Sequence, residues 1–163
     1  MYQGITKHIE KIVVNTGIGR LSNEGHFKDK ILPSITKDFA VITGQKPSLR
    51  VAKKSIAGFK LREGQVVGMT STLRGQRMGS FLDRLTKIVF PRVRDFRGIK
   101  LSNIDSGGNL TVGIKENIIF PEVTPEDVPF PIGLQVTIVP KDILARDEVI
   151  TLYRSLGIPL QKE

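Results

Sequence analysis

The sequence predicts an α+β fold, a mainly antiparallel β-sheet with α-helices packed on one face. The other face and a basic loop are then available for a ligand. Several short segments alternate apolar and polar residues, as strands with one buried face do. Three longer segments repeat apolar residues at helical spacing. The resulting order, β-α-β-β-α-β-β-α, favours antiparallel pairing over the parallel sheets of βαβ folds.

Length and composition limit the class of protein. The 163 residues suit one domain with a proper core, and we find no linker or repeat, so we predict a single unit over residues 1–163. No apolar run approaches the roughly 20 residues of a membrane span, and the N-terminus lacks the apolar region of a signal peptide. The absence of cysteine excludes disulfides and thiolate metal sites, and it fits an intracellular protein.

The first half of the chain supplies three strands and one helix. Residues 8–15 are β-branched and predict a strand. Apolar residues at helical spacing predict a helix over 27–43, which either kinks at Pro33 or begins near it and is closed by Gly44. Further strands are predicted at 48–53 and 65–73.

The strand at 65–73 has two different faces. One face carries Val67, Met69, Ser71 and Leu73. The other face carries Val66, Gly68, Thr70 and Thr72, with Arg74 following. Two hydroxyls in line with a guanidinium suit contact with sugar and phosphate better than they suit a core.

The second half begins with the strongest predicted helix, 76–89, which ends at Pro91. Its predicted apolar stripe consists of Met78, Phe81, Leu82, Leu85 and Ile88. Strands are predicted at 110–114 and 132–138, separated by an irregular proline-rich, acidic segment at 121–131. A last helix, about 146–156, is expected to bury Val149, Leu152, Tyr153 and Leu156.

Charge is distributed unevenly along the chain. The net charge is +9, yet residues 1–100 carry 20 Lys and Arg against 7 Asp and Glu, whereas residues 101–163 carry 5 against 9. Within 46–62 six cations and no acid occur: Lys46, Arg50, Lys53, Lys54, Lys60 and Arg62. We therefore expect a surface for a polyanion in the first hundred residues, because unpaired charges are expensive to bury.

The pattern favours RNA over duplex DNA. The sequence shows no helix-turn-helix signature or strongly basic recognition helix. The cations instead lie on a glycine-punctuated loop and at strand ends, beside Asn15 and Gln45, which can hydrogen-bond sugars and base edges. Phe59 either stacks on an exposed base or anchors this loop to the core. A membrane surface is the alternative target, but the strongest helix uses its apolar stripe in a core.

Signals for catalysis are nearly absent. His8 and His26 stand at no metal-ligand spacing, and neither a nucleophile elbow nor a phosphate loop is present. Gly17-Ile18-Gly19 superficially suggests a dinucleotide fingerprint, but Ser22 replaces the third glycine. These glycines either let backbone approach an RNA phosphate or simply form a turn. We therefore predict a non-enzyme without cofactor or metal; the alternatives are a general RNA-binding protein and a nucleotide-binding enzyme.

Ordered motifs over residues 9–139 resemble those of the large-subunit ribosomal protein five family, in its bacterial form. The matching segments are KIVVNTGIG, TGQKP, AKKSIAGFKLREG, TLRGQRM, FPRVRDFRG, DSGGNLTVGIKENIIFPE and GLQVTI. The resemblance implies a cytoplasmic structural protein of the large ribosomal subunit that binds 5S rRNA in the central protuberance. Family members usually begin with one or two helices before the first strand, and we expect these to be absent because this chain starts almost at that strand.

The resemblance also implies roles for individual residues. The expected 5S rRNA surface consists of Asn15, Gly17, Gly19, Gln45, Lys46, Thr70, Thr72, Arg74 and Arg77. The loop expected to contact the elbow of the peptidyl-site tRNA consists of Lys53, Lys54, Ser55, Ile56, Ala57, Gly58, Phe59 and Lys60. We expect this loop to be mobile until tRNA orders it, whereas the 5S rRNA surface is largely preformed.

A further implied contact is a bridge to small-subunit protein thirteen. Its candidate residues are Arg92, Arg94 and Arg97, together with the acidic segment 121–131. Other expected partners are large-subunit rRNA and the neighbouring proteins that bind 5S rRNA.

Overall fold

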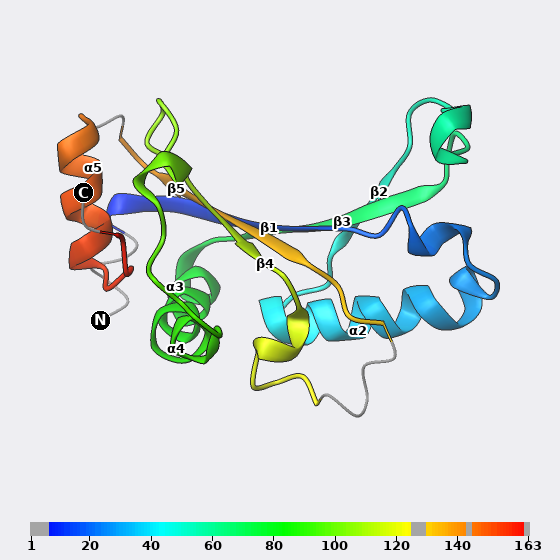
Figure 1. The fold of residues 1–163 in the computed structure, drawn as a ribbon, viewed down its shortest axis with the longest axis horizontal. Coiled ribbons are helices and arrows are strands. Elements are labelled where there is room, and N and C mark those ends of the chain that lie inside the picture. Colours follow the sequence, from blue (N-terminus) through cyan, green and yellow to red (C-terminus); the bar gives the residue numbers. More distant parts are fainter. Residues whose placement is uncertain (1–6, 125–129, 143–144, 162–163) are drawn as a thin grey trace.

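The structure is a computed structural model that describes residues 7–124, 130–142 and 145–161. Its centre is an antiparallel sheet of five strands in the order β2-β3-β1-β5-β4 (Figure 1). The strands are β1 (Ile9–Gly17), β2 (Ser48–Val51), β3 (Val66–Leu73), β4 (Leu110–Ile114) and β5 (Leu134–Pro140). The sheet thus joins segments from both halves of the chain, and a single domain over residues 1–163 stays a prediction.

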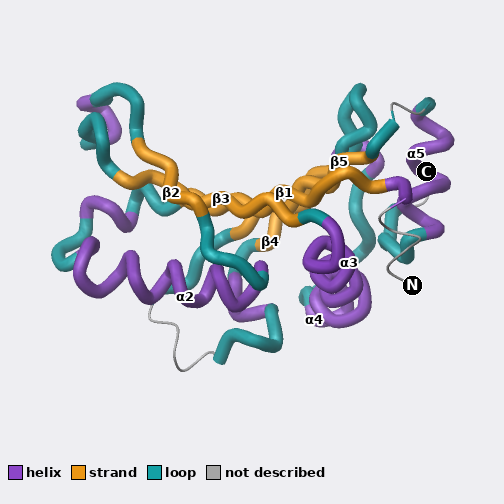
Figure 2. The backbone as a smooth tube through the Cα atoms, turned by 180° about the vertical axis from the view of Figure 1, so that it is seen from behind, coloured by secondary structure: helices purple, strands orange, loops and turns teal. Residues whose placement is uncertain are grey.

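Helices cover one face of this sheet, which confirms the predicted α+β class. They are α2 (Leu32–Thr43), α3 (Gly75–Arg84), α4 (Phe90–Arg92) and α5 (Arg146–Ser155). Figure 2 shows α2, α3 and α4 on the same side of the strands, with α5 at one end. None of the described α-helices α2, α3 and α4 lies on the opposite face of the sheet.

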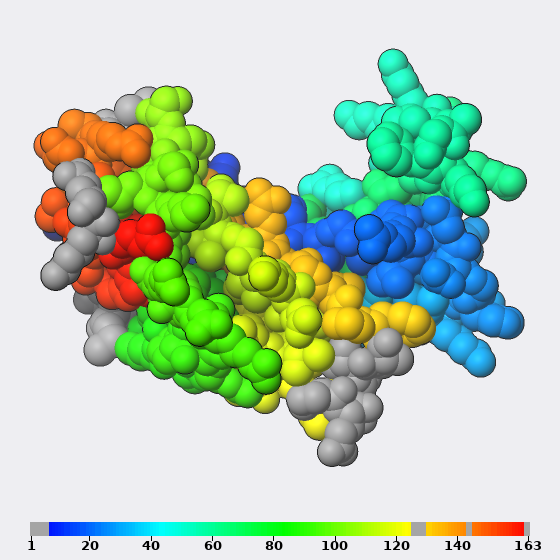
Figure 3. Space-filling view, in the orientation of Figure 1, coloured from blue at the N-terminus to red at the C-terminus, as the bar shows by residue number. Residues whose placement is uncertain are grey.

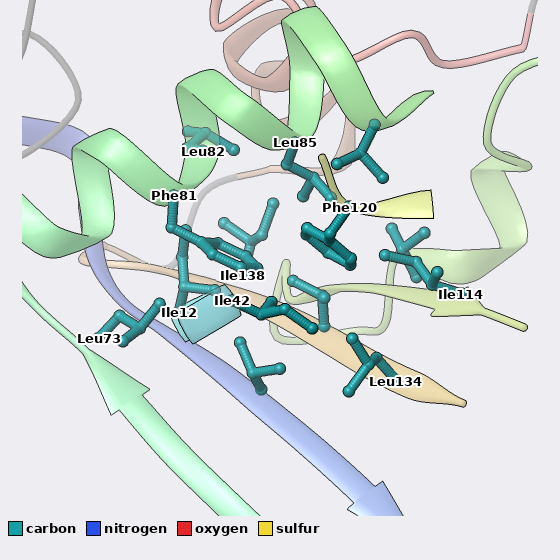
Figure 4. Packing of buried hydrophobic residues seen from close by; sticks show 14 of the residues in the cluster. Ile12, Ile42, Leu73, Phe81, Leu82, Leu85, Ile114, Phe120, Leu134 and Ile138 are labelled. Atoms are coloured by element: carbon teal, nitrogen blue, oxygen red, sulfur yellow. The ribbon is translucent and has the colours of Figure 1, made fainter. Parts of the chain in front are cut away.

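From Ile12 onward, strict alternation along the central strand separates the two faces. Ile12 and Val14 of β1 are fully buried and point towards the helices, while Val13 and Asn15 lie on the open face. One hydrophobic cluster fills the space between sheet and helices. In Figure 4 side chains from α3 and α2 meet those from the strands, and Phe120 packs near Phe81 with a ring separation of 6.2 Å.

The helix predicted at 76–89 contains a π turn, which corrects two expectations. The turn spans Leu85–Val89 and lies between α3 and α4. A π turn holds more residues than an α turn, so it moves Val89 and Phe90 to the buried side and leaves Ile88 38% exposed. The sequence predicts that Pro91 ends the helix, but helical structure continues to Arg92. The neighbouring wide turn reduces the clash that a proline makes with preceding carbonyls.

The segment predicted as a helix at 27–43 begins with a second π turn, Phe27–Ile31. Pro33 lies in the first turn of α2, where its missing N–H is harmless, so the start near Pro33 is the correct alternative. Gly44 closes α2 in a left-handed conformation with φ of 73°, as predicted.

The C-terminal elements differ from their predictions in detail. The last strand is shifted to Leu134–Pro140. Helix α5 buries Val149 and Tyr153 and also Ile150, which is absent from the predicted set, whereas Leu152 and Leu156 are only half-buried. Residues 121–124 are irregular as predicted, but 125–129 lie outside the described residues.

We predict that Gly68→Ala destabilises the fold by about 1–3 kcal/mol, because an overpacked site must shift its neighbours. A Cβ at Gly68 would lie 2.9 Å from the carbonyl oxygen of Thr16 on the adjacent strand. Urea unfolding followed by circular dichroism measures this change. Gly17→Ala is the matched control, since Gly17 pairs with Gly68 in the register yet has open space around its Cα. Equal unfolding midpoints for the two variants would contradict the prediction.

Candidate nucleic-acid interface

The open face of the sheet carries rows of polar side chains. Because paired residues of antiparallel strands project to the same side, Gln135, Asn15, Thr70 and Ser48 form one row across four strands. A second row contains Thr111, Thr137, Val13 and Thr72. Amide and hydroxyl groups in such rows can hydrogen-bond the sugars and base edges of a nucleic acid.

Four residues gather where β3 leads into α3, and we call Gln45, Thr72, Arg74 and Arg77 the sheet-end cluster. Nε2 of Gln45 donates to the carbonyl of Thr72 at 3.1 Å, and Arg77 Nη1 donates to Oε1 of Gln45 at 3.3 Å. The turn that joins strand and helix requires Gly75, whose φ is 58°. These contacts bring together residues that are 32 positions apart in the sequence.

Arg74 is held on this surface by an acidic neighbour. Its Nη1 donates to the carboxylate of Glu10 at 3.1 Å and to the backbone carbonyl of Glu10 at 3.3 Å. The hydrogen bond from Arg74 lowers the pKa of Glu10, with a further contribution from Lys11. The Arg74 side chain nevertheless stays 55% exposed, so a phosphate can reach it.

Not every predicted 5S rRNA residue joins this cluster. Gly17 pairs with Gly68, and Gly19 lies against Val67, so both glycines belong to the opposite end of β3. Gly68 and Arg74 are six positions apart, which is about 20 Å along a strand. Thr70 lies on the open face between these ends but is only 7% exposed, and Lys46 is exposed beside Gln45.

Residues 52–64 form a hairpin between β2 and β3, which we call the basic hairpin. Backbone bonds join Ala52 to Gln65 and Gly64 at its base, and Ile56 to Leu61 near its tip. The hairpin stands out from the rest of the surface in Figure 3. All residues from 53 to 60 are exposed. Its mobility in the free protein stays a prediction.

The position of Phe59 decides between the two alternatives for this residue. Its side chain is 76% exposed, more than that of any other large apolar residue among those described. Phe59 therefore does not anchor the basic hairpin to the core. It is available for stacking on a base or ribose.

The arginines of the predicted bridge lie beyond the π turn, away from the sheet-end cluster. Phe96 stacks on Phe90 with ring centres 5.3 Å apart and planes inclined by 7°, which fixes the loop to the core. Arg92, Arg94 and Arg97 are exposed around it. Arg84 pairs with Glu122 and also donates to the carbonyl of Ile42 at 3.1 Å, so it ties the start of the acidic segment to the helices.

Gln135, Thr137 and Thr111 are candidate contact residues that the sequence reasoning missed. The signal was available, because the apolar residues Leu134, Val136 and Ile138 alternate with them. Had that alternation been extended to the opposite face, it would have placed Gln135 and Thr137 on the open face of the sheet.

The described residues contain no group of three or more His, Cys, Asp or Glu placed to hold a metal ion. None of the described helices has the length and apolarity needed to cross a membrane. Gly17 is the last residue of β1 and Gly19 follows it, and β1 pairs antiparallel to both of its neighbours. This geometry differs from the parallel βαβ unit in which a dinucleotide fingerprint works.

Comparison with known proteins identifies the family. A model described as ribosomal protein L5 matches residues 7–62, and one described as the C-terminus of the same ribosomal family matches residues 66–160. The chain is 46% identical over 153 residues to the large ribosomal subunit protein uL5 of Rubrobacter xylanophilus, covering 94% of this chain and 82% of that one.

Other relatives carry the same name. The uL5 protein of Anaeromyxobacter dehalogenans is 47% identical over 156 residues, covering 94% of this chain and 83% of its own length. That of Thermus aquaticus is 40% identical over 163 residues, covering 99% and 87%. These relatives are bacterial, which indicates a ribosomal location in the cytoplasm. The chain belongs to the ribosomal protein L5 family and is a non-enzymatic, structural constituent of the large ribosomal subunit.

Proposed function

We propose that the chain binds 5S rRNA through the sheet-end cluster and the adjoining open face of the sheet. The observation that carries this proposal is the cluster itself. At the end of β3 the amide of Gln45 bonds the backbone carbonyl of Thr72 and the guanidinium of Arg77, and the guanidinium of Arg74 follows the strand. Guanidinium groups bind phosphate in a bidentate manner, and the neighbouring polar rows offer partners for ribose hydroxyls.

The contacts of Arg74 support a preformed site. Its exposed ion pair with Glu10 is weak in water, so an RNA phosphate can take the place of the carboxylate. Before RNA binds, Glu10 limits the conformations of the Arg74 side chain, and this reduces the conformational entropy that the side chain loses when it binds the RNA phosphate. Asn15 and Lys46 extend the surface on either side, and large-subunit rRNA and neighbouring 5S rRNA-binding proteins are the further partners proposed.

We predict that Arg74→Ala weakens binding of 5S rRNA by about 1–3 kcal/mol and lowers the salt dependence of the affinity, because a phosphate contact is lost. Filter binding with purified protein at several salt concentrations measures both quantities. Lys37→Ala, which removes one exposed charge from α2 on the helical side, is the control. The double variant Lys53→Ala/Lys54→Ala should retain nearly full affinity. A loss equal to that of Arg74→Ala would disprove the division into two surfaces.

This experiment also separates the proposal from general RNA binding. A coating protein would bind unrelated RNAs of equal length with equal affinity when salt is raised. We expect a preference for 5S rRNA that persists at raised salt, because hydrogen bonds to a shaped RNA are screened less than phosphate contacts are.

We propose that the basic hairpin contacts the elbow of the peptidyl-site tRNA. Three features support this role: Lys53, Lys54 and Lys60 are exposed, Phe59 is uncovered, and the hairpin projects beyond the sheet. The exposed backbone of Ser55 to Gly58 lies between these side chains. The base of the hairpin is separated from the sheet-end cluster by the length of β3, so one chain can hold both RNAs at once.

We predict that Phe59→Ala weakens tRNA binding at the peptidyl site by about 1–3 kcal/mol, the range for loss of one stacking contact. Ribosomes reconstituted with the variant protein and titrated with labelled tRNA give this affinity. Val41→Ala serves as the control, because Val41 is also an exposed apolar residue but lies on α2. A lowered unfolding midpoint with unchanged tRNA binding would instead make Phe59 a structural residue.

We propose that Arg92, Arg94 and Arg97 contribute to a contact with small-subunit protein thirteen, together with the segment 121–131. Their exposure around the anchored Phe96 supports this role. Replacing all three arginines by alanine should slow subunit association in light scattering several-fold, because charged groups steer encounter. The variant Lys28→Ala/Lys30→Ala/Lys37→Ala removes three charges elsewhere. Equal rates for the two triple variants would rule out this assignment.

A further inference from the structure

One glutamine connects the base of the basic hairpin to the segment that follows β1. Nε2 of Gln65 donates to Ser22 Oγ at 2.7 Å and to Asn23 Oδ1 at 2.9 Å. Its Oε1 accepts a hydrogen bond from the backbone N–H of Arg62 at 3.0 Å. The amide therefore uses both donor hydrogens and its acceptor, and it spans more than 40 positions of sequence.

Both ends of this connection are themselves fixed. Ser22 Oγ donates to the carbonyl of Gly19 at 2.7 Å, and the Ser22 N–H donates to the carbonyl of Ile18 at 3.0 Å. On the other side, the carbonyl of Gln65 accepts from the N–H of Ala52 at 2.8 Å. The Gln65 side chain thus joins the exit of β1 to the point where the hairpin leaves the sheet.

Little else supports the hairpin on this side. An open pocket of about 770 Å³ lies between its base and the segment 22–29, with Lys60, Arg62, His26 and Phe27 among its lining residues. Residues 53–60 are exposed, so core packing of the hairpin is confined to its base, where Ala52 is buried, and the tip is free to tilt into this space. The polar contacts of Gln65 are the direct restraint that the described residues provide between hairpin and segment 21–23.

We propose that Gln65 is a positioning residue that sets the orientation of the basic hairpin relative to the sheet. This inference rests on the proposed tRNA contact for its functional consequence, but the orientation itself is measurable without tRNA. Without the amide, the backbone hydrogen bonds at the base of the hairpin remain, and the hairpin can tilt about this base. The hairpin then samples several tilts, and only a fraction of them presents Lys53 and Phe59 correctly.

The first experiment measures orientation directly. The chain contains no cysteine, so nitroxide labels on Lys37→Cys and Ala57→Cys report the distance from α2 to the hairpin tip without side reactions. We expect the distance distribution to be distinctly broader in Gln65→Ala than in the protein with Gln65, with both proteins folded at the temperature of the measurement. Equal widths in the two proteins would overturn the proposal.

The second experiment links orientation to binding. Gln65→Ala should weaken tRNA binding about three- to tenfold, which corresponds to a correctly oriented fraction of about one third to one tenth, and should leave 5S rRNA affinity unchanged. Ser22→Ala/Asn23→Ala should have the same effect and add nothing to Gln65→Ala, because all three residues act in one contact.

The chain offers a matched control for the Ser22→Ala/Asn23→Ala variant. The sequence Leu-Ser-Asn occurs at 21–23 and again at 101–103, in both cases as a short 3₁₀ helix. Ser102→Ala/Asn103→Ala should therefore leave orientation and tRNA binding unchanged. If Phe59→Ala weakens tRNA binding but Gln65→Ala does not, Gln65 is no positioning residue. If neither Phe59→Ala nor Gln65→Ala changes tRNA binding, the proposed tRNA contact is wrong. The distance distribution then tests by itself whether Gln65 orients the hairpin.

Discussion

The antiparallel pairing of β1 with both β3 and β5 is the constraint on which the remaining structure depends. A strand in the middle of a sheet presents alternate residues to two faces, and its register fixes which residues of its neighbours share each face. With Asn15 opposite both Thr70 and Gln135, polar side chains of three strands point away from the helices. A slip by one residue would place Ile12 and Val14 in water and would destroy core and RNA surface together.

The two proposed RNA surfaces depend on this sheet to different degrees. The hydrogen-bonded strands fix the position of the sheet-end cluster, because Gln45 bonds the backbone carbonyl of Thr72 at the end of β3. The basic hairpin begins where the ladder ends, and its exposed side chains contribute nothing to the core. The orientation of the hairpin must therefore be set by local polar contacts, and the Gln65 amide provides them. Such contacts are weaker than core packing, which suits an element that adapts to a ligand.

Local patterns in the sequence predicted much of this arrangement, but not the contacts between distant segments. Alternation placed Thr72 and Arg74 on the open face, and helical spacing placed α2 and α3 against the sheet. The π turn at Leu85–Val89 was not predictable in this way, because periodicity assumes a constant number of residues per turn. Nor does any spacing mark Gln65 as the partner of Ser22. These two residues meet only because the exit of β1 and the base of the hairpin lie at the same end of the sheet.

The acidic partner of Arg74 bears on how a basic surface selects its RNA. A guanidinium that is free in water attracts any phosphate, whereas one that already bonds Glu10 must exchange a carboxylate for the phosphate. The exchange is favourable only where the RNA backbone matches the position of the guanidinium and where Thr72, Gln45 and the polar rows gain partners at the same time. Because displacing Glu10 costs the same for every RNA, selectivity at this proposed site depends on the additional partners that only a matching RNA supplies. The cations of the basic hairpin form no ion pair within the part of the chain that the structure describes, so that surface depends on its shape and orientation for selectivity.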